Sequence, residues 1–297
     1  MGHGSCGSAF RVNGVEESDI FVAMPGVSLF SCLLIFLTSL ASSAEPVPAP
    51  ADQRDFTDSI NGCAPATILN LLKFSAPEYA AAYHGLLGAD DGVKMRYVVD
   101  RYFRNRPSVA YPGQKRWGLH GIESNDLAAG LNELLVESGI ENLNATFLDR
   151  DEGEDEAGHL LRCRQLMAES IRQGVMPILS LRSFVVKHRE ENQNDPVWEA
   201  GIHHYVLIKA LRGENSDVGF DLEVIDPWRG KETVVHVHRE AHGQAFRALR
   251  GVEETGVWLD GKPFLQVLAH DLPSLRPQNL EWSERFVVVA NFLVGRF

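Results

Sequence analysis

Three residues far apart in the 297-residue chain have the types needed for catalysis by a thiol. Cys63 lies in the segment NGCAPA, where the turn at Asn61 and Gly62 is followed by apolar residues at helical spacing. A cysteine at a helix N-terminus is activated, because the free N–H groups and the dipole of the first turn stabilise its thiolate. The sequence therefore predicts that Cys63 is a nucleophile.

A base and an orienting carboxylate follow on two predicted strands. The segment GIHHYVLI begins with His203 and His204, and alternation sends His203 to the same face as Lys209. We expect the Lys209 face to be wetter, so His204 should face the helices and the nucleophile. The segment VIDPW ends the next strand with Asp226. If the two strands form an antiparallel hairpin, Asp226 returns beside His204 and can orient its imidazole.

The elements that must position these residues fall into two halves. Helical spacing of apolar residues is typical of the first half, and short apolar runs bounded by Gly, Asn, Asp and Pro are typical of the second. The predicted helices are 64–74, 77–87, 91–104, 124–138 and 158–173. The predicted strands are 176–186, 203–211, 220–225, 233–238 and 285–294. Helices followed by an antiparallel sheet indicate an α+β fold, and since both halves supply site residues, we expect one domain over 55–297.

Together these motifs resemble those of the papain-like cysteine peptidases, in particular the bacteriocin-processing peptidases that remove double-glycine leaders. Cys-x-Pro at a helix start, His-aromatic-Val-Leu-Ile and Val-Ile-Asp-Pro occur in the same order across residues 55–230. The resemblance implies a papain-like fold, with the nucleophile helix packed on a C-terminal antiparallel sheet. It also implies a peptide or protein substrate, with Cys63 as nucleophile, His204 as base and Asp226 as its orienter.

The chain departs from the family at the oxyanion site. A glutamine is expected about six residues before the nucleophile, but Thr57 occupies that position, and the nearest amides are Gln53 and Asn61. Loss of one oxyanion donor costs about 10²–10³ in rate. A catalytically weak or inactive peptide-binding domain therefore stays open as an alternative. A transglutaminase-like acyltransferase, which uses the same three residue types, stays open as well.

The remaining cysteine and histidines have less specific patterns. Cys163 lies on an apolar face of a predicted helix and is expected in the core, although a disulfide between Cys63 and Cys163 is the alternative in an oxidising compartment. A zinc site at His236, His238 and His242 would lack a further ligand at a diagnostic spacing, so an exposed strand is favoured there. We predict no metal and no cofactor.

Composition and the N-terminus bear on partners and location. The net charge of −12 argues against a nucleic-acid partner. The apolar run VSLFSCLLIFLTSL is too short for a membrane span and is followed by small residues ending at Ala44. We predict a signal peptide over 1–44, a Pro-rich linker over 45–54 and an exported mature chain (periplasmic, extracellular or cell-surface) without a membrane span. Acidic residues before Met24 favour translation from Met24, with an uncleaved anchor as the alternative; the oligomeric state is not predicted.

Overall fold

The structure is a computed structural model. It describes residues 47–119, 121–140, 144–148, 151–189, 192–213, 216–239, 265–272, 275 and 285–296. The predicted signal peptide over 1–44 and His242 lie outside these residues. Within them, no helix combines the length and the apolar character that a membrane crossing requires.

Four helices come first in the chain and pack together. They are α2 (Cys63–Phe74), α3 (Pro77–Gly85), α4 (Asp91–Tyr102) and α5 (Ser124–Glu137). Two short 3-10 turns, η1 (Gln53–Asp55) and η2 (Ser59–Asn61), lead into α2. A fifth helix, α6 (Glu156–Arg172), starts where the Asp155 side chain accepts a hydrogen bond from the Gly158 N–H, at 2.7 Å. The five predicted helices are confirmed to within a few residues.

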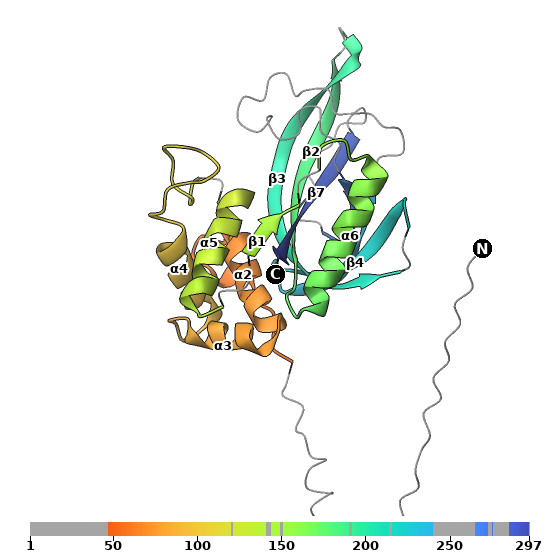
Figure 1. The fold of residues 1–297 in the computed structure, drawn as a ribbon. Helices are drawn as coiled ribbons and strands as arrows, with labels where there is room; N and C mark the ends of the chain where they lie inside the picture. The colour runs from red at the N-terminus through yellow and green to blue at the C-terminus, as the bar shows by residue number, and fades with distance from the viewer. Residues whose placement is uncertain are drawn as a thin grey trace, which may run out of the picture. The chain divides into compact units, whose positions relative to one another are not determined.

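The strands form one antiparallel sheet that closes on itself (Figure 1). In the described part of the chain the strands are β1 (Asn144–Phe147), β2 (Ile178–Arg189), β3 (Asn192–Arg212), β4 (Gly219–Asp226), β5 (Lys231–Arg239), β6 (Leu265–Leu268) and β7 (Arg285–Arg296). Their order is β1-β7-β2-β3-β4-β5-β6, and β6 also pairs with β7. Six strands therefore make a closed barrel, and β1 is added beside β7.

The expected fold class is wrong. A papain-like α+β fold would set the nucleophile helix on an open C-terminal sheet, whereas the closed barrel dominates this structure. Closure depends on β6, a strand of four residues that bridges β5 and β7 and that the sequence did not predict. Closing a sheet satisfies edge strands that would otherwise expose unpaired backbone groups.

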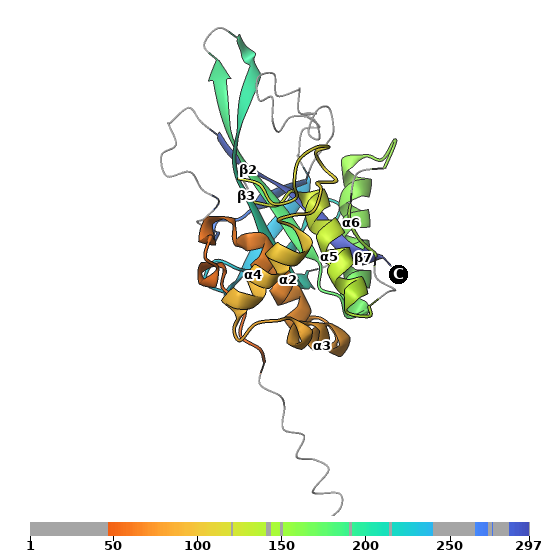
Figure 2. The ribbon, with the colours of Figure 1, turned by 90° about the vertical axis from the view of Figure 1, so that its left-hand side faces the viewer.

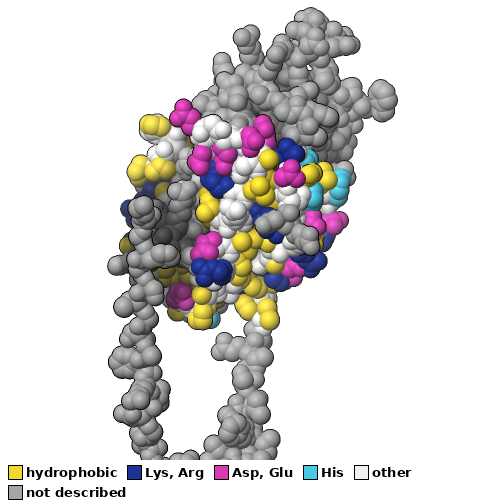
Figure 3. All heavy atoms as spheres, turned by 45° about the vertical axis from the view of Figure 1, so that its right-hand side comes forward, with side chains coloured by type: hydrophobic (Ala, Val, Ile, Leu, Met, Phe, Trp, Pro, Cys, Tyr) yellow, Lys and Arg dark blue, Asp and Glu magenta, His cyan; other side chains and the backbone are white. Residues whose placement is uncertain are grey.

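Two apolar clusters occupy the two faces of β3. The first joins helices α2 to α5 with Tyr205 and Leu207, and the second joins α6 with Val206, Ile208 and apolar side chains from the other barrel strands. Figure 2 shows α2, α4 and α5 lying over β2 and β3. On the face shown in Figure 3, acidic and basic side chains are interspersed with apolar ones.

These clusters correct the predicted face of His204. Alternation puts His204 in phase with Val206 and Ile208. These two residues belong to the second cluster, which we call the barrel cluster, and not to the first, which contains α2 to α5. The error has a local cause: the register of β3 against β4 shifts between Ile208 and Ala210. Such an irregularity breaks the alternation, so Lys209 does not mark the face of the residues before it.

Candidate active site

Cys63 is the first residue of α2, with Gly62 as the N-cap. The thiol therefore lies at the positive end of the helix dipole, beside N–H groups that have no partner within the helix. Glycine is required before it, because a Cβ at position 62 would lie 2.8 Å from the carbonyl oxygen of Gln53. Cys63 itself is 8% exposed, so the thiol is recessed but not sealed.

His204 and Asp226 form a buried pair. The distance from His204 Nε2 to Asp226 Oδ1 is 2.8 Å. The antiparallel pairing of β3 with β4, in which Leu207 faces Ile225, brings the two residues together and confirms the predicted hairpin. Asp226 Oδ1 also accepts the backbone N–H of Trp228 at 2.8 Å, which fixes the carboxylate in the turn after β4.

Cys63 lies close enough to His204 to contribute, with Asp226, to the raised pKa of the imidazole. Because Nε2 is taken by Asp226, the imidazole has Nδ1 left for the thiol. Strand β3 runs along α2 at this point, where Thr67 Oγ1, one turn after Cys63, donates to the carbonyl oxygen of Tyr205 at 3.0 Å. His204 therefore lies near the start of α2, although it is on the same face of β3 as Val206 and Ile208 of the barrel cluster.

The surroundings of His204 favour its protonated form. Burial alone would lower the pKa of His204, but hydrogen bonds and negative charge from Asp226 and Cys63 outweigh it and raise this pKa to about 10. The imidazole is therefore protonated at neutral pH. An imidazolium beside a thiol at a helix N-terminus is the environment in which a thiolate is stabilised.

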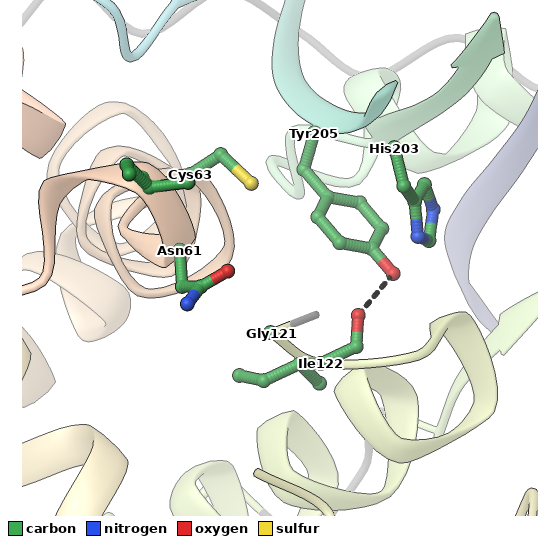
Figure 4. Close-up of a pocket in the computed structure, with 7 residues that line it drawn as sticks. Asn61, Cys63, Gly121, Ile122, His203 and Tyr205 are labelled. Carbon is green, nitrogen blue, oxygen red and sulfur yellow. Dashed lines mark hydrogen bonds between the residues drawn. The ribbon is translucent and has the colours of Figure 1, made fainter. Parts of the chain in front are cut away.

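A small pocket opens at Cys63 (Figure 4). Its walls are Ile60, Asn61, Gly121, Ile122, His203 and Tyr205. The sulfur of Cys63 points toward the side of the pocket formed by Tyr205, and the Tyr205 hydroxyl donates to the carbonyl oxygen of Ile122 at 2.9 Å. The sequence had pointed to Asn61 and His203, whereas the places of Ile60, Gly121, Ile122 and Tyr205 in the lining are found only in the structure.

His203 has surroundings unlike those of His204. Its Nε2 is 2.8 Å from Ser180 Oγ, and its Nδ1 is 3.4 Å from Arg182 Nη2. Since a guanidinium can only donate, Nδ1 accepts and Nε2–H donates to the serine. Burial, together with the charges of Arg182 and His204, lowers the pKa of His203 well below its usual value. His203 is therefore a neutral wall of the pocket.

The candidate oxyanion donors lie in different places. Thr57 is exposed and accepts a hydrogen bond from the Arg96 guanidinium. Gln53 is buried, and its Nε2 donates to the carbonyl oxygen of Ser59 at 2.9 Å. Asn61 lines the pocket, with its Nδ2 donating to Asp58 Oδ2 at 2.9 Å. Of the two amides near the nucleophile, Asn61 is the one that a substrate in the pocket would contact.

A short segment that ends at the first residue of η1 connects both sides of the site. Ala51 and Asn70 of α2 exchange two hydrogen bonds, of 2.6 Å and 3.3 Å. The Gln53 N–H donates to the carbonyl oxygen of Pro227 at 2.9 Å, and the Arg229 N–H donates to Asp52 Oδ1 at 3.2 Å. We call residues 51–53 the N-terminal strap. It belongs to the stretch predicted as a linker, and it joins α2 to the turn that holds Asp226.

Neither a disulfide nor a metal cluster is found in the part of the chain that the structure describes. Cys63 and Cys163 are both free thiols. No three metal-ligating side chains converge among these residues. His236 Nδ1 lies 2.6 Å from Asp221 Oδ1, and His238 Nδ1 lies 3.0 Å from the carbonyl oxygen of Arg239. The two strand histidines are thus engaged locally.

Comparison with known proteins gives no assignment. No family model, curated protein or solved structure matches the chain. What the chain does is therefore inferred from the group formed by Cys63, His204 and Asp226, together with the pocket that opens at the thiol.

Proposed function

We propose that the chain is an exported cysteine peptidase with Cys63, His204 and Asp226 as its catalytic residues. One observation carries the proposal: the buried His204 pairs with Asp226 at 2.8 Å and lies close enough to Cys63 for this side chain to contribute to its raised pKa. The motif resemblance to the bacteriocin-processing peptidases supports the same activity. Export is proposed from the N-terminal sequence alone, as signal-peptide cleavage near Ala44.

The chemistry starts from a thiolate–imidazolium pair. The Cys63 thiolate attacks the carbonyl carbon of a peptide bond, and the carbonyl electrons move onto oxygen. When the tetrahedral intermediate collapses, the C–N bond breaks and His204 gives its Nδ1 proton to the leaving amine. Neutral His204 then takes a proton from water, whose oxygen attacks the thioester, and the C–S bond breaks to release the carboxylic acid and restore the thiolate–imidazolium pair. Asp226 holds Nε2–H throughout and thereby fixes the tautomer.

The oxyanion needs donors in the pocket. The backbone N–H of Cys63 is one, since it belongs to the first turn of α2. Asn61 Nδ2 is the proposed second donor, because its longer bond, of 3.4 Å to the carbonyl oxygen of Leu119, is the one that a substrate can replace most easily. Asn61 would then stand in for the family glutamine that Thr57 replaces.

A peptide-binding domain without catalysis is the second candidate function. It is favoured by the state of Thr57, which is engaged by Arg96 and cannot serve the oxyanion. A transglutaminase-like acyltransferase differs only in the acceptor, because an amine in place of water would take the acyl group from Cys63. Hydrolysis is proposed over acyl transfer because the motifs resemble those of peptidases.

Cleavage of quenched fluorescent peptides by wild type, Cys63→Ala and Cys163→Ala tests the proposal. Cys63→Ala should lower kcat by about 10³ or more, with the melting temperature unchanged. Cys163→Ala is the matched control, since it removes the other thiol and should keep turnover. Mass spectrometry of the wild-type protein during turnover should find the acyl group on Cys63. Unchanged turnover in Cys63→Ala would contradict the proposal, and binding without any cleavage would favour the second candidate.

A further inference from the structure

The turn that begins at Asp226 needs support from outside the sheet. Among the described residues, the ladder between β3 and β4 ends on this side with the pairing of Leu207 and Ile225, so Asp226 lies beyond it. The turn also contains Arg229, whose φ of 71° makes it the one described residue other than glycine in the left-handed region. A residue with a side chain keeps this conformation only where its surroundings fix it.

The N-terminal strap supplies this support. The Arg229 N–H donates to Asp52 Oδ1 at 3.2 Å, and the Gln53 N–H donates to the carbonyl oxygen of Pro227 at 2.9 Å. Asp52 and Arg229 are 177 residues apart in the chain. The conformation of the turn therefore depends on a segment that local sequence does not connect to it.

Asp52 is itself fixed in place. It is the N-cap of η1, where its Oδ1 accepts the Arg54 N–H at 3.0 Å, and the Arg54 guanidinium binds Oδ2 through Nε at 2.9 Å. Burial would raise the pKa of Asp52, but hydrogen bonds from Arg54 and Arg229 outweigh it and lower this pKa. Asp52 is therefore ionised at neutral pH, and a charged acceptor holds the Arg229 N–H more strongly than a neutral one.

The strap also rests on the nucleophile helix. Ala51 exchanges two hydrogen bonds with the side chain of Asn70, which is buried in α2. Gln53 lies against Gly62, the N-cap residue of α2, because a Cβ built at Gly62 would be 2.8 Å from the Gln53 carbonyl oxygen. Since the strap contacts both α2 and the turn after β4, a change in it alters how the carboxylate lies relative to the thiol.

We propose that Asp52 is a positioning residue of the reaction: by holding Arg229, it keeps the Asp226 carboxylate against His204. The inference rests on the proposed function and adds a residue that neither motif nor pocket indicates. Asp52 does not line the pocket, so it acts through Asp226 and not on the substrate. Without Asp52 the turn can relax, and Asp226 then holds the imidazole for only part of the time.

The test compares Asp52→Ala with Asp52→Asn in the whole protein. Asp52→Ala should lower kcat for a quenched fluorescent peptide by about tenfold with little change in KM, because geometry and not binding is lost. Asp52→Asn should stay within about twofold of wild type, since its amide oxygen still accepts the Arg229 N–H. If Asp52→Asn is as slow as Asp52→Ala, the ion pair with Arg54 is responsible and the inference is overturned.

Titration of His204 gives a second readout that needs no turnover. Burial lowers the pKa of His204, but the hydrogen bond to Asp226 and the contribution of Cys63 raise it to about 10. A loosened Asp226 should therefore lower the pH of half-protonation in Asp52→Ala by about one pH unit or more, and Asp52→Asn should keep the wild-type value. The measurement is NMR of protein labelled with ¹⁵N-histidine, with the His204 signals assigned from His204→Gln.

Asp155→Ala is the matched control. Asp155 is also an N-cap aspartate, and it accepts the Gly158 N–H at 2.7 Å at the start of α6, outside the pocket lining. Its replacement should lower the melting temperature by an amount similar to that of Asp52→Ala, with kcat and the His204 midpoint unchanged.

Equal kcat and equal midpoints in wild type and Asp52→Ala would overturn the inference, as would an equal effect of Asp155→Ala. Failure of the proposed function has a different result. A wild-type protein that cleaves no peptide would remove the peptidase, whereas a lower His204 midpoint in Asp52→Ala would still show that Asp52 positions Asp226.

Discussion

Two regions of the molecule each bring together a thiol, an imidazole and a carboxylate. The α2 group is Cys63, His204 and Asp226, and the α6 group is Cys163, His159 and Glu154. In the α6 group the sulfur lies 3.7 Å from both ring nitrogens of the histidine, and the carboxylate lies 3.3 Å from Nδ1. By residue type alone, either group is a candidate for thiol catalysis, and the differences between them show what chemistry needs beyond proximity.

The first difference is the position of the thiol on its helix. Cys63 is the first residue of α2 and lines a pocket, whereas Cys163 lies inside α6 and is 0% exposed. Burial raises the pKa of the Cys163 thiol to about 12. A thiol that remains protonated and cannot be reached is a small core residue.

The second difference is how the imidazole is partnered. His204 has one nitrogen bonded to Asp226, which leaves the other for the nearby thiol. In the α6 group, Arg162 lies 3.2 Å from His159 Nδ1 and 2.7 Å from Glu154, so a guanidinium engages both the ring and the carboxylate. The hydrogen bond from Arg162 dominates the other contributions and lowers the pKa of Glu154 to about 2. This carboxylate is therefore paired mainly with a guanidinium rather than with an imidazolium.

The largest effect is expected from removing each imidazole. His204→Ala should lower kcat/KM by about 10³ or more, because proton transfer and thiolate stabilisation are both lost. His159→Ala should change it by less than about twofold, since His159 does not line the pocket. Steady-state cleavage of one fluorescent peptide by both variants measures the contrast.

The adjacent His203→Ala is the control for this prediction. His203 lines the pocket but is bonded to Ser180, so its loss should be much milder than that of His204. If His203→Ala is instead the more damaging change, the base has been assigned to the wrong histidine.

A smaller and independent contrast is expected in thiol reactivity. Iodoacetamide at neutral pH should alkylate Cys63 at least about 100 times faster than Cys163, because the thiolate is the reactive form and burial keeps Cys163 protonated. Peptide mapping by mass spectrometry measures both rates in one sample. His204→Ala should slow the labelling of Cys63. Equal rates for the two cysteines, or no labelling of either before denaturation, would remove the distinction.

The smallest contrast concerns the pH dependence of stability. The pKa of His204 is raised from 6.5 to about 10, so its protonated form stabilises the fold fully below pH 6.5, and this contribution is lost as pH rises toward 10. Glu154 has its pKa lowered from 4.5 to about 2, so its contribution is present above pH 4.5 and is lost as pH falls toward 2. The α2 group therefore weakens in alkali and the α6 group in acid.

Urea unfolding across this pH range measures both windows. His204→Gln should flatten the alkaline part of the free energy of unfolding, and Glu154→Gln should flatten the acidic part, where the partly exposed ion pair makes the effect small. Identical alkaline profiles for wild type and His204→Gln would show that His204 is not held protonated in the fold.

Local patterns predicted much of this molecule. The five helices and four of the five longer strands follow from the spacing of apolar residues, and the β3–β4 hairpin follows from the loop between two apolar runs. Only the second half of β3 was predicted, since β3 begins at Asn192 and the predicted strand began at residue 203. That hairpin is why His204 and Asp226 could be paired from the sequence. The second thiol–imidazole contact also had a signal, because His159 and Cys163 are four residues apart on a predicted helix.

Closure of the barrel could not be predicted in the same way. It depends on the pairing of Leu265 with Ala290 and of Gln266 with Val289. The spacing of apolar residues within one segment does not indicate which distant segment it pairs with. The same limit applies to the pocket, since Gly121 and Tyr205 meet Cys63 only after folding. The predicted face of His204 was wrong for another reason. The register shifts between Ile208 and Ala210, so the exposure of Lys209 does not indicate the face of the residues before it.

The N-terminal strap makes the beginning of the folded unit a structural part of the candidate site. Its hydrogen bonds to Asn70, Pro227 and Arg229 are all made by three consecutive residues. A deletion that removes these residues therefore removes all of the bonds together. Removal of residues 51–53 would detach the Asp226 turn from α2. A fusion partner should therefore be joined before Ala51, because a junction within the N-terminal strap would interrupt the link between α2 and the Asp226 turn.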